Sequence, residues 1–295
     1  MNIEAISGSA TVAIACTFIF LLAAKSWHLV ARSLSAHPNF PDAIMREAAQ
    51  RFRDELDTLS RKQSTYLGAG LMFVFIFAVA HTFEAHQLFE GYPAWQLYVL
   101  LATLLAAAGF ALYRLVCLVR QWREVRFLRD ANIAVGHSLQ RIAVGHGRVF
   151  HDVVTPAGVV DHVIVGPAGI YAVNVVAHRA MRRESVKIAE GELRFRPDGK
   201  TISIADIASK TTRLEQEFRD LLRNSVRVRS VIAVPGWHAE TQSGDGHRAD
   251  NERPWPLLRG WRSEADYLKD EDVQSLQQHP TKTCKRSPSA RRKSK

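Results

Sequence analysis

The stretch "VVDHVIVGPAGIYAVNVV", residues 159–176, consists of two runs rich in valine and isoleucine around a Gly-Pro-Ala-Gly turn. Such runs are typical of β-strands, and a proline second and a glycine fourth suit a four-residue turn. If the residues that flank the turn pair with each other, Asp161 lies opposite Asn174 on the adjacent strand. Val176 shares their face, because side chains alternate along a strand. The hairpin therefore predicts one face that carries an acid, an amide and an aliphatic side chain.

The remainder of the C-terminal half predicts an α/β domain. No glycine-rich phosphate loop of the dinucleotide or Walker type is present. The order of the elements predicts a mixed central sheet flanked by helices. Around the hairpin, the expected elements are a helix over 125–142, a strand at 147–154, a second hairpin at 185–195, a helix within 202–223, an almost wholly apolar strand at 228–236, a polar loop over 238–256 and a short helix over 270–279.

Three apolar runs precede this domain, at residues 6–24, 66–80 and 93–113. A membrane-spanning helix needs about 20 largely apolar residues, so the middle run is short unless it extends to Phe83. Aromatic residues at the ends of the runs favour three transmembrane helices over a buried soluble hairpin.

The charges of the loops predict the orientation of these spans. Residues 25–65 contain seven Lys or Arg, and residues 82–92 contain none. Because positively charged loops stay in the cytoplasm, we expect the N-terminus outside and the α/β domain inside, most simply at a bacterial inner membrane. The predicted division is a first transmembrane helix over 1–24, a cytosolic amphipathic helix within 25–65, a transmembrane hairpin over 66–119, the α/β domain over 125–279 and a basic tail over 280–295.

The pattern of residues 41–62 predicts the amphipathic helix. Pro41 and Asp42 suit its first turn. An apolar stripe follows at helical spacing, formed by Met45, Ala48, Ala49, Phe52, Leu56 and Leu59. Three uses stay open for this helix: lying on the inner leaflet, pairing with a second copy of the chain, or docking on the C-terminal domain.

The basic charge of the chain is concentrated at its C-terminal end. The formal net charge is +10, and residues 282–295 contain seven Lys or Arg and no acid, which leaves +3 for the rest. This tail lacks apolar residues and is expected to be disordered, either simply solvated or in contact with anionic lipid or nucleic acid. The candidate contact residues are Lys282, Lys285, Arg286, Arg291, Arg292 and Lys293. The three cysteines show no disulfide or zinc spacing.

The face of the first hairpin has a known chemical use. Hydrolysis of a phosphodiester needs a divalent metal, commonly Mg²⁺ held by one or two carboxylates, water and phosphate oxygens. A lysine nearby stabilises the developing charge. An aspartate on one strand and an acid-x-lysine on its partner place all three groups on one face.

The segments "GHSLQRI" and "GRVFHDVVTPAGVVDHVIVGPAGIYAVNVV", with "DHVIVGPAGIYAV" as their core, resemble the nuclease-related domain family, NERD. The resemblance extends from about residue 129 to the short C-terminal helix. It implies a restriction-endonuclease-like fold and metal-dependent nucleic-acid processing as the ancestral activity. Of four family positions, this sequence keeps Asp161. His137 stands where the first helix carries a glutamate, Asn174 where the second acid stands, and Val176 where the lysine stands.

Loss of these groups predicts a domain without catalysis, which binds nucleic acid or a protein partner at the membrane and needs no metal. A Mg²⁺- or Mn²⁺-dependent nuclease that uses Asp161 with displaced ligands is the first alternative. A membrane scaffold that binds only protein, or a second copy of itself, is another. Asp161 also has a structural interpretation, as a buried acid that caps a turn or pairs with an arginine. The five histidines near the hairpin match no common metal-ligand spacing, and they are His137, His146, His151, His162 and His178.

Overall fold

The computed structural model describes residues 9–10, 12–23, 26, 46–83, 93–143, 147–167, 169–179, 185–196, 199–223, 226–239, 247–250 and 268–283. The chain forms two compact units. One unit comprises Met1–Asn39 and Asp54–Val125, and the other comprises Phe40–Arg53 and Arg126–Lys295. Most of the basic tail and the predicted loop at 82–92 lie outside the described residues.

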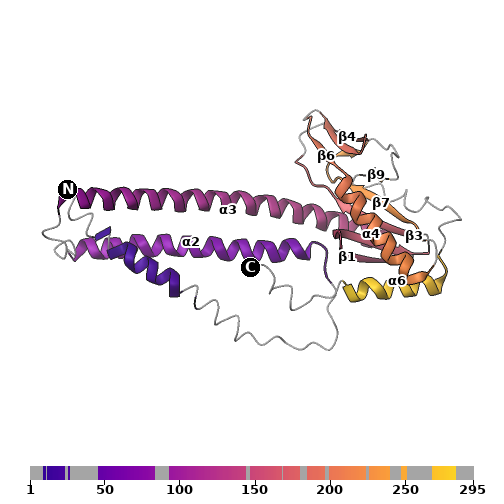
Figure 1. Cartoon of the computed structure of the whole chain (residues 1–295), viewed down its shortest axis with the longest axis horizontal. Coiled ribbons are helices and arrows are strands. Elements are labelled where there is room, and N and C mark those ends of the chain that lie inside the picture. The colour runs from indigo at the N-terminus through magenta and orange to yellow at the C-terminus, as the bar shows by residue number, and fades with distance from the viewer. Residues whose placement is uncertain are drawn as a thin grey trace. The chain divides into compact units, whose positions relative to one another are not determined.

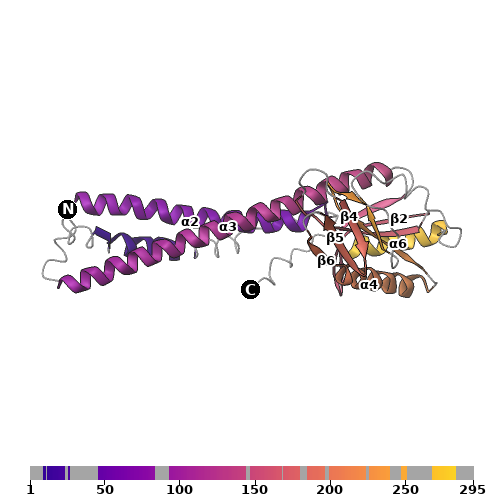
Figure 2. The same cartoon turned by 90° about the horizontal axis from the view of Figure 1, so that it is seen from above.

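Long helices dominate the first unit. α2 runs from Gln50 to Thr82 and α3 from Ala94 to Ala143 (Figure 1). The turned view in Figure 2 shows the same two uninterrupted helices. The sequence had predicted a separate amphipathic helix before a transmembrane run at 66–80. The structure joins the two, because the polar residues between them include neither proline nor glycine and do not stop a helix.

Among the described residues, one helix, α2, is long and apolar enough to cross a membrane. The expectation of three spans is therefore supported for one of them. The first apolar run contains the shorter apolar helix Val12–Ala23 among the described residues, and its crossing stays a prediction. The third run lies within α3, and its crossing stays a prediction.

The second unit contains the predicted mixed sheet. Its five strands have the order β1-β2-β3-β7-β9, with β1, β2 and β3 antiparallel and with β7 and β9 parallel to β3. The strands are β1 (Arg148–Thr155), β2 (Gly158–Gly166), β3 (Gly169–Val175), β7 (Val228–Ala233) and β9 (His247–Asp250). The predicted register of the first hairpin is confirmed, since Val165 pairs with Ile170 and His162 with Val173.

A second, four-stranded sheet with the order β6-β5-β4-β8 was not expected. Its strands are β4 (Ser185–Ala189), β5 (Glu192–Arg196), β6 (Thr201–Ser203) and β8 (His238–Ala239). The predicted turn at Glu190 and Gly191 joins β4 to β5, with both residues at positive φ, as a two-residue hairpin turn requires. The predicted loop at 238–256 was partly wrong, since β8 and β9 fall inside it and pair along β4 and β7.

Helices cover both faces of the five-stranded sheet. Val135 and Leu139 of α3 pack on one face, against Tyr171 and Val173 among others. On the other face lie α4 (Ala205–Leu222) and α6 (Asp270–Thr283), which are neighbours in Figure 1. Their contacts are Leu214, Phe218, Val273 and Leu276 on the helices, and Phe150, Val163, Ile170 and Ala172 on the strands. Both helices were predicted, and the buried side chains of α4 recur at helical spacing.

Candidate functional site

The two strands of the first hairpin separate at Asp161. The pairing of β2 with β3 extends only to His162 and Val173, and beyond it the carboxylate of Asp161 accepts the backbone N–H of Val175 at 2.7 Å. On the other side, β1 pairs with β2 before and after Asp152, which has a φ of 52°. Asp152 and Asp161 therefore face each other at a local break in the sheet.

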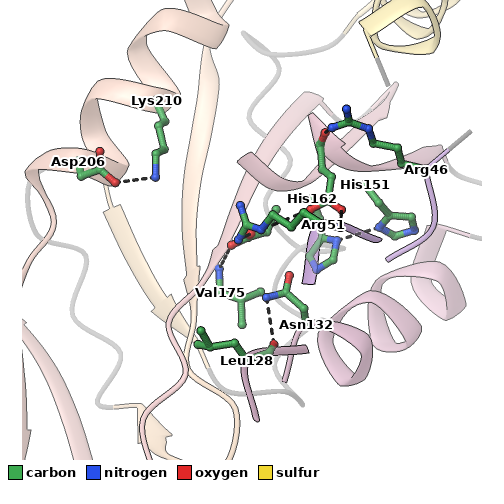
Figure 3. A network of polar contacts seen from close by, with 11 residues as sticks. Arg46, Arg51, Leu128, Asn132, His151, His162, Val175, Asp206 and Lys210 are labelled. Carbon is green, nitrogen blue, oxygen red and sulfur yellow. Dashed lines mark hydrogen bonds and ion pairs between the residues drawn. The ribbon is translucent and has the colours of Figure 1, made fainter. Parts of the chain in front are cut away.

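Both aspartates are buried, and both contact Arg51 at the start of α2, which Figure 3 labels. The Nη2 of Arg51 donates to Oδ1 of Asp161 in a close ion pair. Its Nε lies 3.7 Å from Oδ1 of Asp152, and its backbone N–H donates to Oδ2 of Asp152 at 3.1 Å. Arg46 adds a bond from Nη1 to the backbone oxygen of Asp152 at 3.0 Å. The predicted amphipathic segment thus docks on the α/β domain through its first residues, one of the three uses left open.

Burial is the main influence on the charge of this pair of acids. Burial raises the pKa of Asp161, whereas the charge of Arg51 and the hydrogen bond from the N–H of Val175 lower it. It also raises the pKa of Asp152, again against Arg51. The alternative that Asp161 is a buried acid paired with an arginine therefore matches the geometry, and the arginine is Arg51.

The other family positions do not complete a metal site. Asn174 is buried beside Asp161 on β3, and its Nδ2 has no hydrogen-bond partner. Val176 follows the end of β3 and packs against the apolar cluster of the second sheet. His137 is exposed on α3, while the preceding Gly136 faces the imidazoles of His151 and His162.

These residues do not fit the Mg²⁺ that the fold family implies. The two oxygens of Asp161 are engaged by Arg51 and by the N–H of Val175, and a guanidinium already balances the charge. Among the described residues, no group of three or more His, Cys, Asp or Glu side chains gathers to hold a metal ion. Lys210 of α4 contributes a favourable charge to Asp161, but its Nζ pairs with Asp206.

A buried pair of histidines lies on β1 and β2 next to the two aspartates in the sequence. Nδ1 of His151 is 2.8 Å from Nδ1 of His162, and Nε2 of His151 is 3.1 Å from the side-chain nitrogen of Gln140. Because that amide nitrogen only donates, Nε2 of His151 accepts, and its ring carries its proton on Nδ1 and donates to His162. The proton of His162 is then on Nε2, and an interaction with the backbone of Asn132 partly opposes the lowering of the pKa of His162 by burial.

This arrangement requires both histidine rings to be neutral. Burial lowers the pKa of His151 to about 4 and that of His162 well below its usual value. Of the other histidines, His178 stacks on Trp237, and His146 lies outside the described residues. The sequence pointed to neither the histidine pair nor Arg51. The available signals were Asp152 and Asp161, charged residues inside apolar strands, each of which demands a partner when buried.

A mixed sheet covered by helices, with an acid where two strands of a hairpin separate, agrees with the α/β arrangement expected from the sequence. Residues 129–235 match the family model of the nuclease-related domain, NERD, which covers less than half of the chain. No curated protein and no solved structure matches the chain. The resemblance drawn from the hairpin is therefore confirmed for residues 129–235, and the loss of catalysis and the membrane role are matters for proposal.

Proposed function

We propose that this protein is a membrane-anchored NERD-domain protein whose nuclease-related domain does not cleave nucleic acid and acts as a binding module at the membrane. The observation that carries the proposal is the ion pair between Asp161 and Arg51. It places a fixed positive charge on the one acid that the family pattern retains. Without the second acid and the lysine, nothing in that pattern is left to hold a metal or to stabilise a leaving group.

Anchoring by α2 is supported by its surface. Large apolar side chains are exposed along it, including Leu71 (73% exposed), Val74 and Phe75. In water such a surface is unfavourable, and in lipid it is expected. The apolar runs at 6–24 and 93–113 supply the other two spans of this proposal, and the loop charges favour a cytoplasmic domain.

Nuclease assays on the full chain in detergent test the loss of catalysis. Plasmid, single-stranded DNA and RNA are incubated with Mg²⁺ or Mn²⁺, alongside the Asp161→Asn variant. We expect no cleavage above the level of the variant. Cleavage that requires Asp161 would refute the proposal and establish the alternative of an active nuclease with displaced ligands.

A binding experiment separates the two kinds of partner. Nucleic-acid affinity that falls steeply with salt, and persists after removal of residues 282–295, would make the domain a nucleic-acid module. Affinity that disappears with those residues would assign the contact to the tail alone, through the candidate residues from Lys282 to Lys293. If neither the full chain nor the chain without residues 282–295 binds nucleic acid, the module is expected to bind a protein partner.

The family positions themselves are tested by restoring them. Replacing His137 by Glu, Asn174 by Asp and Val176 by Lys supplies the missing groups, but Arg51 still neutralises Asp161. We therefore expect the triple variant to gain affinity for Mn²⁺ only when Arg51→Ala is added. A folded quadruple variant without metal affinity would contradict the assignment of these positions.

A further inference from the structure

The contacts around Arg51 form a binding site for one side chain. Its guanidinium lies between two buried carboxylates that come from different strands, Asp161 on β2 and Asp152 on β1. The side chains of these acids are 6% and 0% exposed, so their charges are strongly unfavourable without a cation. Arginine suits such a place, because its planar group keeps its charge and donates in several directions at once.

The chain before α2 is shaped to deliver this guanidinium. Ala49 has a φ of 62°, a left-handed conformation that turns the backbone into the helix immediately before Gln50. The carboxylate of Asp152 then accepts the N–H of Arg51 in the first turn of α2, where an anion is favourable. Arg46 binds the backbone oxygen of the same aspartate from the other side of the turn.

Close packing fixes the same segment on α3. A Cβ on Gly136 would lie 2.8 Å from the Cβ of Ala48, so the segment passes α3 at a distance that only glycine permits. Arg51 is thus held by ion pairs and by a helix cap, and its segment is held by the close contact of Ala48 with α3. All of these residues belong to one compact unit.

We infer that the former nuclease site has become a socket that selects a guanidinium in place of a metal ion, with Arg51 as its ligand. The inference rests on the proposed loss of catalysis and names what took over the site. Its consequence is an intramolecular dock: the socket fastens the first turn of α2 to the nuclease-related domain. The ligand of the socket is an arginine side chain, and it is supplied by residues 46–53 of this same chain.

Chemical rescue tests the selectivity of the socket. The full-length Arg51→Ala chain is prepared in detergent, and its Tm is measured with increasing methylguanidinium, methylammonium or Mg²⁺. Arg53→Ala is the matched control, because Arg53 pairs with the exposed Glu47 and does not reach the two acids. Adding Asp161→Asn to Arg51→Ala removes one wall of the socket.

We expect Arg51→Ala to lower the Tm and methylguanidinium to restore it saturably, by about 2–4 °C once it exceeds its Kd several-fold. Methylammonium and Mg²⁺ should restore less, Arg53→Ala should not respond, and Asp161→Asn should abolish the rescue. A larger restoration by Mg²⁺, or equal restoration by methylammonium, would overturn the inference. Such a result leaves the proposed function standing, since that falls only if the wild-type chain cleaves nucleic acid.

A measurement on the wild-type chain covers the case in which Arg51→Ala does not fold. Hydrogen exchange of residues 46–53 is followed with and without millimolar Mn²⁺. A guanidinium socket predicts unchanged protection, because the metal has no place to enter. Faster exchange of this segment on adding Mn²⁺ would mean that the metal displaces Arg51, and the site would then be a metal site that Arg51 merely covers.

Discussion

Gly136 of α3 leaves no room for a side chain, so Gly136→Ala is expected to destabilise the nuclease-related domain although alanine is the better helix former. The added Cβ would lie 2.8 Å from the Cβ of Ala48 and 3.4 Å from Cε1 of His162. Favourable carbon contacts begin at about 3.5 Å, so at least the first pair must move apart. Ala48 lies in the segment that carries Arg46 and Arg51, and its displacement stretches their bonds to Asp152.

The magnitude follows from opposing effects. Replacing glycine by alanine inside a helix contributes about 1 kcal/mol of stability. Overpacking a tight contact costs about 1–3 kcal/mol, and a buried acceptor that loses its partner costs about 1–3 kcal/mol more. The net expectation is a loss of about 1–5 kcal/mol, which lowers the Tm of a domain of this size by about 2–20 °C.

A double-mutant cycle with Ala48→Gly identifies the cause. Removing the methyl group of Ala48 opens the space that a methyl group at position 136 needs, so in that background Gly136→Ala should become neutral or stabilising. Thermal unfolding is followed by tryptophan fluorescence, to which Trp237, buried in the domain, contributes as one of six tryptophans. If the two substitutions are additive within about 0.5 kcal/mol, the contact does not limit position 136 and the reasoning is refuted.

Two predictions concern pH. Without Arg51, burial raises the pKa of Asp161 unopposed by the guanidinium charge. The folded state then binds a proton that the unfolded state releases. The destabilisation by Arg51→Ala should therefore grow as the pH rises above about 4. Urea titrations at pH 5 and pH 8 measure this, and an equal loss at both would contradict it. For His151, whose pKa is lowered to about 4, the neutral ring stabilises the fold above about 6.5, and this contribution is lost as the pH falls towards 4. His151→Gln should flatten that acid-side decline in urea titrations between pH 7 and 4, whereas the exposed His137→Gln should leave it unchanged.

Local patterns were sufficient for the hairpin and its neighbours. The Gly-Pro-Ala-Gly turn fixed the register of β2 and β3, and the apolar run at 228–236 contains the central strand β7. The helix spacing in 202–223 likewise located α4. In each case the information lies within a few residues of the element itself, as turn chemistry and periodicity require.

The partner of Asp161 was beyond such reasoning, because Arg51 lies 110 positions away in the sequence. Nothing near either residue indicates that α2 begins on the face of the nuclease-related domain. Strand β9 was missed for a similar reason. His247–Asp250 has little strand propensity, and it is ordered by the free edge of β7, where tertiary context overrides propensity. The long helices were divided wrongly at polar residues, which change hydropathy without interrupting a helix.

The contact of Arg51 with Asp152 and Asp161 also bears on how this sequence can change over time. Removing one member of a buried ion pair is expected to cost about 3–5 kcal/mol, whereas replacing all members by well-packed apolar residues is often neutral. Each of the three residues is therefore protected from single substitution by the other two. A lineage could lose every catalytic function and still keep Asp161, because the steps that would erase it are individually deleterious. An aspartate at this position can therefore be held by its partners alone, and in a related sequence it does not by itself indicate a nuclease.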